Sequence, residues 1–366
     1  MELKKKIGDE LSLFFTLRQT SKKWYIPLLA AICVGIPLLV GLYFENLRLG
    51  LMGSLGGLVI LYLPETGSRT NRFVTILVAS FAFIISFSVG QFFSFHPVAA
   101  VIAMGLFTFI VHWIVLVYKT SPPRSFFFIM IAALSICQPF HLETIPTKIG
   151  ALSLGTMLAS ILATIHIIWK TNPSDNPEQD NSEPSVFTKN DFADIWEAIV
   201  MAAFMAGGMG IGYLMGYQNP YWIPVSTAAV MQGASLYHIR QKTAYRILGT
   251  FVGLGLCWLL LTFVDTPLEI CVSIIVLQFI IELLIIRHYA LAVIFITPMT
   301  IFLSEAASPL MASPKDLIEL RFWEIVIGSV LGAFGGWMLY KEKIRYTTLH
   351  GLKRIKVTME KRNKIL

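Results

Sequence analysis

Long apolar runs separated by short polar stretches are the main pattern along this chain. A helix needs about 20 apolar residues to cross the hydrocarbon core of a bilayer, and tilted or buried helices can be shorter or longer. Twelve runs fit this requirement, at 25–44, 49–63, 73–95, 97–118, 125–140, 149–169, 195–217, 221–233, 247–263, 267–286, 289–303 and 322–340. The second and eighth runs are short and interrupted by Gly or Pro. The pattern predicts an all-α integral membrane protein of about twelve transmembrane helices.

A polar stretch divides these runs into two sets of six. It contains three prolines and several acidic residues, which is typical of a flexible linker. We therefore expect a cytoplasmic N-terminal segment at 1–24, a first six-helix repeat at 25–169 and a linker at 170–190. A second six-helix repeat at 191–340 and a basic cytoplasmic tail at 341–366 complete the prediction.

The basic residues predict the orientation, because Lys and Arg concentrate in cytoplasmic loops. With the N-terminus inside, all but four of the 29 Lys and Arg residues lie on the cytoplasmic side. The exceptions are Arg48, Lys148, Lys315 and Arg321. Both termini and the linker are then cytoplasmic, and the expected location is the inner (plasma) membrane. The basic tail is expected on anionic lipid, which accounts for the net charge of +7 without a nucleic-acid partner.

Composition agrees with lipid as the solvent. The chain is 55% hydrophobic and 14% charged, whereas soluble chains carry about a quarter charged residues. The four cysteines lie inside apolar runs without ligand spacing, so neither disulfides nor a metal site is expected. We find no motif for nucleophilic, metal-dependent or phosphate-binding catalysis. The sequence therefore predicts a protein that is not an enzyme and that has no cofactor.

The two sets of six runs are related by a shift of about 173 residues. Phe44-Glu45-Asn46 matches Tyr217-Gln218-Asn219, and Lys148 matches Arg321. Gly155, Ala159 and Ala163 match Gly328, Gly332 and Gly336. Because six is even, both repeats enter the membrane the same way up, so the repeats are predicted to be parallel. Transporter substrate sites tend to lie at the interface between such repeats.

Four stretches of the second half resemble the fusaric acid resistance family, also called aromatic acid exporters. They are Asn219-Pro220-Tyr221-Trp222-Ile223-Pro224-Val225-Ser226-Thr227, then Arg246 to Gly253, then Glu282 with Tyr289-Ala290-Leu291-Ala292 and Thr297-Pro298, and last Arg321 with Gly328 and Gly332. Plant aluminium-activated malate channels are similar at a greater distance. The resemblance covers residues 191–345, while the first half lacks the Tyr-Trp-x-Pro pattern.

The resemblance implies export of aromatic or other small carboxylates. Proton coupling is part of this leading hypothesis, and a passive anion channel of the malate-channel type is the alternative. The expected partners are a small organic anion and the lipid bilayer. Whether a periplasmic adaptor protein joins them is left open, as is the identity of the anion.

Polar residues at the start of the second repeat are candidates for substrate binding. Trp222 could stack on an aromatic ring or act as an interfacial anchor, and Ser226 and Thr227 could donate to a carboxylate or join helices. Gln232 follows on the same short run. Arg240 and Arg246, in the loop expected after it, could gather anions at the cytoplasmic mouth or only reflect the usual positive-inside bias.

Two ionisable residues inside apolar runs are candidates for proton coupling. Ionisable side chains in a membrane are costly and therefore rare. Glu282 lies within the tenth run, and a shift of 170 residues pairs it with His112 in the fourth. The two could face each other as a proton-sensitive pair. Glu282 has a structural alternative, since it could pair with Arg287 or reach the cytoplasmic interface.

Overall fold

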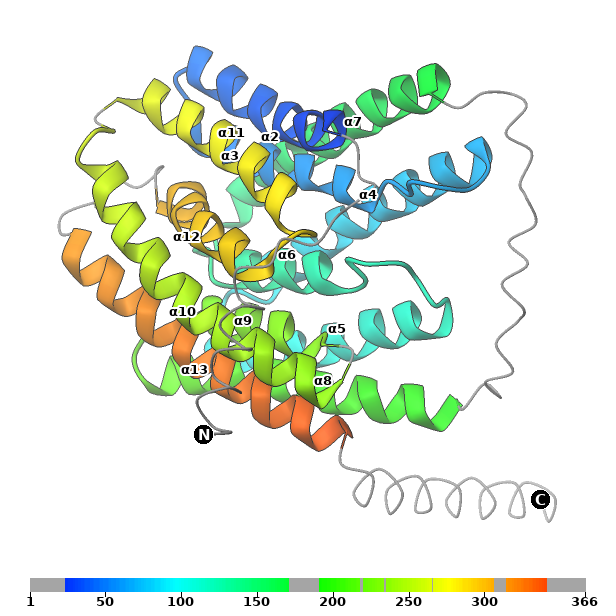
Figure 1. Ribbon diagram of the computed structural model, residues 1–366, viewed down its shortest axis with the longest axis vertical. Helices are drawn as coiled ribbons and strands as arrows, with labels where there is room; N and C mark the ends of the chain where they lie inside the picture. Colours follow the sequence, from blue (N-terminus) through cyan, green and yellow to red (C-terminus); the bar gives the residue numbers. More distant parts are fainter. Residues whose placement is uncertain are drawn as a thin grey trace, which may run out of the picture. The chain divides into compact units, whose positions relative to one another are not determined.

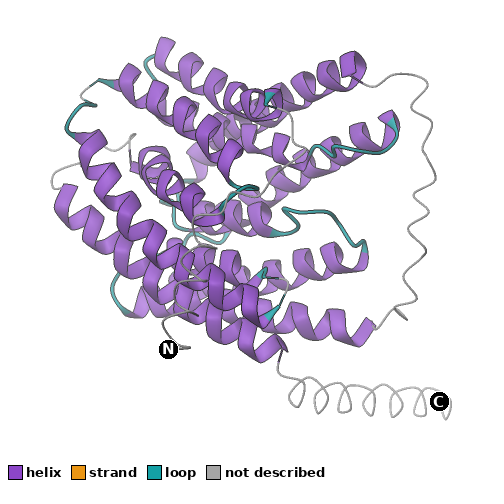
Figure 2. Ribbon diagram, in the orientation of Figure 1, coloured by secondary structure: helices purple, strands orange, loops and turns teal. Residues whose placement is uncertain are grey.

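The computed structural model describes residues 24–170, 191–217, 220–233, 235–264, 266–305 and 314–340, and in these ranges it contains helices and loops but no strand (Figures 1 and 2). The helices are α2 (Tyr25–Tyr43), α3 (Leu47–Gly57), η1 (Leu58–Tyr62), α4 (Arg69–Phe92), α5 (Pro97–Val117), α6 (Phe126–Ile136), η2 (Leu142–Thr144), α7 (Ile145–Lys170), α8 (Asp191–Leu214), α9 (Trp222–Met231), α10 (Leu236–Leu261), α11 (Pro267–Leu284), α12 (Tyr289–Glu305) and α13 (Pro314–Tyr340). The prediction of an all-α fold is confirmed for this part of the chain.

Eight of the described helices are long and apolar enough to cross a membrane, namely α2, α4, α5, α7, α8, α10, α11 and α13. Four further apolar stretches are shorter, at Leu47–Tyr62, Phe126–Ile136, Trp222–Met231 and Tyr289–Leu303. They correspond to the second and fifth predicted runs of each half. The chain is thus a multi-pass membrane protein by helix length and composition, and twelve crossings stay a prediction.

Several helices begin earlier than the apolar pattern indicates, and α10 and α4 show a local reason. α10 starts at Leu236, where the Ser235 hydroxyl accepts the backbone N–H of His238 at 3.3 Å. α4 starts at Arg69, where Ser68 accepts from Asn71 at 3.2 Å. Serine caps satisfy free backbone N–H groups at a helix start. The expected loop after the eighth run is therefore wrong, because Arg240 and Arg246 lie on the first turns of α10.

The described residues form two compact units, and each draws on both predicted halves. One unit contains the described residues up to Ile60, together with Ala151–Leu162 and Ala244–Trp323. The other contains Leu61–Gly150, Ala163–Thr243 and the remainder of α13 from Glu324. The long helices α7, α10 and α13 contribute residues to both. These units therefore do not coincide with the predicted repeats at 25–169 and 191–340, which stay a prediction.

Each unit combines equivalent segments from opposite halves. In the first unit α2 packs against α3 and α11, and α11 packs against α12 (Figure 1). In the second unit α8 packs against α9 and α5, and both α5 and α9 contact α6. α2 and α8 are the first predicted segments of the two halves, and α5 and α11 are the fourth. Each unit therefore pairs the first segment of one half with the fourth segment of the other. This recurrence supports the repeat hypothesis.

Close glycine contacts also recur at the positions that the sequence repeat pairs. In the first unit, a Cβ added to Gly155 on α7 would meet the carbonyl oxygen of Gly53 on α3. In the second unit, one added to Gly328 on α13 would meet Ile223 and Ser226 on α9. Small residues let helices approach closely in lipid. Gly328 therefore has a packing role where α13 meets α9.

Candidate functional site

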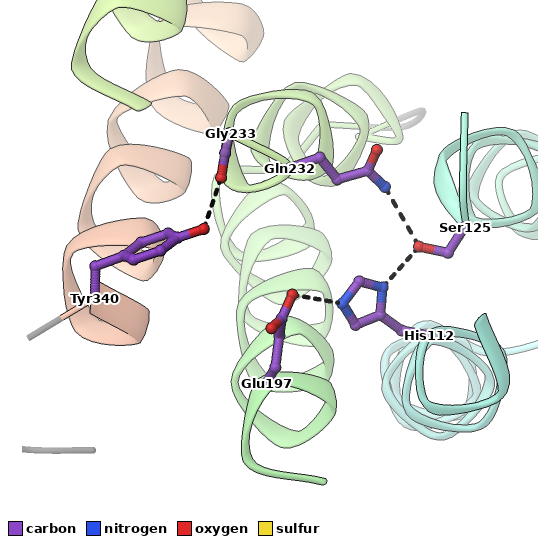
Figure 3. Close-up of polar contacts among 6 residues, drawn as sticks. All are labelled: His112, Ser125, Glu197, Gln232, Gly233 and Tyr340. Carbon is purple, nitrogen blue, oxygen red and sulfur yellow. Dashed lines mark hydrogen bonds and ion pairs between the residues drawn. The ribbon is translucent and has the colours of Figure 1, made fainter. Parts of the chain in front are cut away.

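A chain of polar side chains lies in the second unit, where α5 passes the ends of α6 and α9 (Figure 3). His112 is on the last third of α5, and only 1% of it is exposed. Its Nδ1 atom lies 2.7 Å from the hydroxyl oxygen of Ser125, which is fully buried. A buried polar group requires a partner, and His112 and Ser125 supply one to each other.

Gln232 extends this chain to α9. Its side-chain amide donates to the same Ser125 hydroxyl at 3.3 Å. The Lys242 ammonium on α10 donates to the backbone carbonyl of Gln232 at 3.4 Å. The next carbonyl, that of Gly233, accepts from the hydroxyl of Tyr340 on α13 at 3.0 Å (Figure 3). The last carbonyls of a helix have no partner inside it, so these contacts satisfy the C-terminal end of α9.

Glu197 lies on the other side of the imidazole. Its Oε1 atom is 3.5 Å from Nε2 of His112, and its side chain is 40% exposed. This distance is longer than an ordinary N–H···O hydrogen bond of about 2.7–3.2 Å. Nε2 makes no hydrogen bond within the described part of the chain. The arrangement therefore puts a half-exposed carboxylate beside a buried imidazole nitrogen (Figure 3).

Local sequence explains why these groups meet. α6 begins only after the Pro122–Pro123 pair and spans eleven residues, while α9 spans ten and ends before Gly233. Both helices are thus too short to match their long neighbours in length. The start of α6 lies beside α5, the end of α9 lies beside α6, and polar side chains at those ends satisfy one another. Ser125, at the N-cap of α6, uses its hydroxyl for this chain and makes no capping bond of its own.

The other predicted residues of α9 are buried, and Ser226 and Thr227 lie where α9 meets α13. Trp222 is 5% exposed, and Ser226 and Thr227 are fully buried. The Thr227 hydroxyl lies within hydrogen-bonding distance of two carbonyl oxygens, 2.8 Å from that of Ile223 and 2.9 Å from that of Gly328. This geometry favours the helix-joining interpretation of Thr227, and substrate binding by the three residues stays a prediction.

The two predicted arginines differ in their surroundings. Arg240 is exposed, in the second unit. Arg246 belongs to the first unit, is 5% exposed and contacts the Tyr289 hydroxyl through Nη1 at 3.4 Å. Next to Arg246, Tyr245 stacks on His288 with ring centroids 6.0 Å apart. Arg246 is thus a buried cation beside a tyrosine hydroxyl, whereas Arg240 is an exposed one.

Glu282 belongs to the first unit, on α11, and is 6% exposed. It accepts from the side-chain amide of Gln278 at 3.4 Å. His112 belongs to the second unit, where the carboxylate beside it is Glu197. A coupling role for Glu282 stays a prediction.

The structure thus joins two of the predicted residues, His112 and Gln232, and adds Ser125 and Glu197 to them. Sequence analysis missed these two, although a signal was present. All four side chains belong to segment ends that the charge pattern assigns to the cytoplasmic side. Within the described ranges, no group of three or more His, Cys, Asp or Glu side chains could hold a metal ion.

Part of the sequence matches a known protein family. Residues 205–335, from α8 to α13, match the sequence model described as fusaric acid resistance protein-like. The chain is therefore a membrane protein with a fusaric acid resistance protein-like segment. This segment contains Gln232 and the α9–α13 contact, while His112 and Ser125 come from the first half of the chain.

One relative supports this assignment. The uncharacterized membrane protein YvaC of Bacillus subtilis (strain 168) is 33% identical over 126 residues. These residues make up 34% of this chain and 20% of the relative, so the chain matches about a fifth of that protein's length. No solved structure matches the chain.

Proposed function

We propose that the chain is a membrane transporter that exports small organic anions, with aromatic carboxylates as the substrate class. The observation that carries this proposal is the fusaric acid resistance protein-like segment at 205–335, since fusaric acid is itself an aromatic carboxylic acid. The buried polar chain at the end of that segment's short helix adds support, because transporter sites are often built where membrane helices are discontinuous.

Particular side chains fit an aromatic carboxylate. Arg246 offers a buried guanidinium, and the Tyr289 hydroxyl lies beside it. Charge-assisted hydrogen bonds from arginine to a carboxylate are among the stronger polar contacts. Trp222 could supply a ring for stacking, Ser226, Thr227 and Gln232 additional donors, and Arg240 a positive charge at the mouth. In this proposal Glu282 and His112 are the residues that link transport to protons.

The proposal includes the membrane arrangement expected from sequence. The chain would lie in the inner membrane, with 1–24, the linker at 170–190 and the tail at 341–366 in the cytoplasm. Its repeats would span 25–169 and 191–340. One observation supports this orientation: His112, Ser125, Glu197 and Gln232 come from four segment ends assigned to one side, and they meet in one cluster. A periplasmic adaptor protein would be an additional partner.

Transport into everted membrane vesicles tests the proposal. Vesicles containing the full chain should accumulate radiolabelled fusaric acid and benzoate, while vesicles lacking it should not. Benzamide has the same ring without the charge, so it should not be accumulated and serves as the matched substrate control. Equal uptake of both carboxylates with and without the chain would refute the proposal.

A passive anion channel is the second candidate, favoured by the same family resemblance and by the buried cation Arg246. The energy source separates the two functions. An imposed pH gradient at zero membrane potential should drive accumulation by a proton-coupled exporter. A channel would instead only equilibrate the anion, with flux that follows membrane potential and does not move protons.

A further inference from the structure

The contact between His112 and Glu197 joins two titratable side chains of different exposure. The imidazole is buried and the carboxylate is half-exposed. The carboxylate therefore contacts the buried ring on one side and the exterior of the unit on the other. Histidine is the side chain whose charge ordinarily changes between pH 5 and 8. The pair therefore has two protonation states, one with an overall charge of −1 and one that is neutral.

The hydrogen-bond chain defines the proton positions in the negative state. Gln232 donates its amide hydrogen to the Ser125 hydroxyl oxygen. The Ser125 hydroxyl can then donate to Nδ1 of His112, which leaves the single ring proton of a neutral imidazole on Nε2. Nε2 is the nitrogen beside the Glu197 carboxylate. Every hydrogen in the chain then points from α9 towards α8.

Adding one proton reverses part of this order. The proton binds Nδ1, which becomes a donor, so the Ser125 hydroxyl must turn its own hydrogen away and accept from the ring. The imidazolium also attracts the Glu197 carboxylate more strongly, because a charge-assisted hydrogen bond is shorter than a neutral one. Protonation thus tightens the contact between α5 and α8 and rearranges the contact that joins α6 to α9.

We propose that His112 and Glu197 form a proton-binding gate that admits organic anions to the α6–α9 junction when the cytoplasm becomes acidic. The role of the gate in transport rests on the proposed function, whereas proton binding by the pair does not. With the pair negative, the carboxylate repels an approaching anion. With the pair neutral, this repulsion is gone, and the Lys242 ammonium beside Gln232 attracts the anion.

Other charged groups on the elements packed against α5 do not replace this pair. α8 carries Asp194 one turn before Glu197, and Arg124 precedes α6 with an exposed side chain. On α4, Nε of Arg72 donates to the Pro64 carbonyl at 2.8 Å. None of these groups is a histidine. Within this set, His112 is therefore the only imidazole.

The substrate class explains why a gate that opens on proton binding would be useful to the cell. An aromatic carboxylic acid crosses a bilayer as the neutral acid and releases its proton in the cytoplasm, because carboxyl groups ordinarily titrate near pH 4. Entry of the acid thus delivers both the anion to be exported and the proton that opens the gate. Export would rise when the acid load rises.

Two single variants test the gate because they should act in opposite directions. Glu197→Gln removes the negative charge, so transport of benzoate should stay high at pH 8, where the wild type is slow. His112→Asn leaves Glu197 permanently negative, so transport should stay low at pH 6. Removing one charge near the path should change the apparent affinity for benzoate by about tenfold. The double variant should behave like Glu197→Gln.

Exposed residues of η2 and its flank provide matched controls. His141→Asn and Glu143→Gln make the same chemical changes at exposed positions, and both should keep the wild-type pH profile. If His112→Asn and Glu197→Gln lost transport equally at all pH values while remaining folded, and the double variant did so too, the pair would be structural and the gate refuted.

A second measurement does not depend on transport. In the full chain labelled with 15N-histidine and placed in lipid nanodiscs, NMR should show His112 as the neutral Nε2–H form at high pH and as imidazolium at low pH. The signal missing from His112→Asn identifies it. In Glu197→Gln the midpoint should move to lower pH, because the negative charge beside Nε2 is gone. A signal that does not titrate, or an unchanged midpoint, would refute the proton site even if transport is observed. A normal titration without transport would instead leave the proton site intact and refute the proposed function.

Discussion

At the residue scale, burial separates side chains that look equivalent in the sequence. Arg240 and Arg246 are both basic residues after the eighth apolar run, yet only Arg246 is buried. The difference arises because α10 begins at Leu236, which puts both residues on a helix where position around the axis decides exposure. A prediction from charge counting cannot resolve this, since it treats the stretch as a loop.

Replacing the two arginines singly should therefore give different results. Arg246→Gln should lower the free energy of unfolding by about 2 kcal/mol, because it removes a buried charged group from its hydrogen bonds. Arg240→Gln should change it by less than about 0.5 kcal/mol, as exposed substitutions usually do. Thermal unfolding of the purified chain in detergent measures both values. Equal losses would contradict the assigned burial.

The salt dependence of transport distinguishes the two arginines as well. Any loss of apparent affinity caused by Arg240→Gln should shrink at high salt, because solvent-exposed charges are screened. A loss caused by Arg246→Gln should persist. Benzoate uptake at low and high ionic strength makes the comparison, and a salt-independent effect at Arg240 would contradict its proposed role as an exposed positive charge at the mouth.

Trp222 allows a test of substrate recognition. Trp222→Phe keeps an aromatic ring, whereas Trp222→Leu does not. If the ring stacks on substrate, Trp222→Leu should lower the preference for benzoate over acetate by about fivefold, and Trp222→Phe should largely keep it. Competition between the two anions in vesicles gives the ratio. An unchanged ratio in Trp222→Leu would assign the ring to packing alone.

At the element scale, glycine contacts fix the distances between short and long helices. Gly155 on α7 meets α3, and Gly328 on α13 meets α9. Lipid offers helices little hydrophobic gain from association, so close backbone packing contributes a large part of the stability. The sequence repeat paired Gly155 with Gly328, but it could not show which helix each glycine contacts, because a repeat compares positions along the chain and not neighbours in space.

Alanine substitutions at these glycines should be strongly destabilising. In Gly155→Ala the new Cβ would meet the Gly53 carbonyl, and in Gly328→Ala it would meet the Ile223 carbonyl, both of which are backbone atoms that cannot turn away. Gly207→Ala on α8 is the matched control, since nothing lies within 4 Å of its added Cβ. We expect losses of about 2 kcal/mol or more for the first two and none for the control. Thermal unfolding of the three variants checks this order.

At the scale of the whole molecule, the sequence predicted the helical class and the number of apolar segments, but not which segments pack together. Apolar periodicity is a local property, whereas the pairing of α5 with α8 joins segments from opposite sides of the linker. The same limit explains the site. His112 was identified as an ionisable residue in an apolar run, and the charge pattern assigned Glu197 to the same side of the membrane. Their contact, however, depends on the packing of α5 against α8.

A disulfide between the two halves tests this pairing. The added Cβ of Gly105 on α5 lies 3.1 Å from the Cβ of Ala206 on α8, close to the 3.5–4.5 Å typical of a disulfide. In a background without native cysteines, Gly105→Cys and Ala206→Cys should cross-link two fragments expressed separately from either side of the linker. Gly105→Cys with Gly207→Cys should not. Electrophoresis without reductant detects the cross-link, and absence of the first cross-link would contradict the packing of α5 against α8.

The packing of first-half helices against second-half helices also has a consequence for biosynthesis. Ribosomes deliver the first half to the membrane before the second exists. At that stage α2 and α5 cannot make their contacts with α11 and α8, because those helices have not been synthesised. Until translation passes the linker, these helices present to lipid the faces that are later covered by protein. The nascent first half is thus an incomplete intermediate that an insertion factor could shelter, and premature termination would leave a fragment suited to membrane quality control rather than to independent folding.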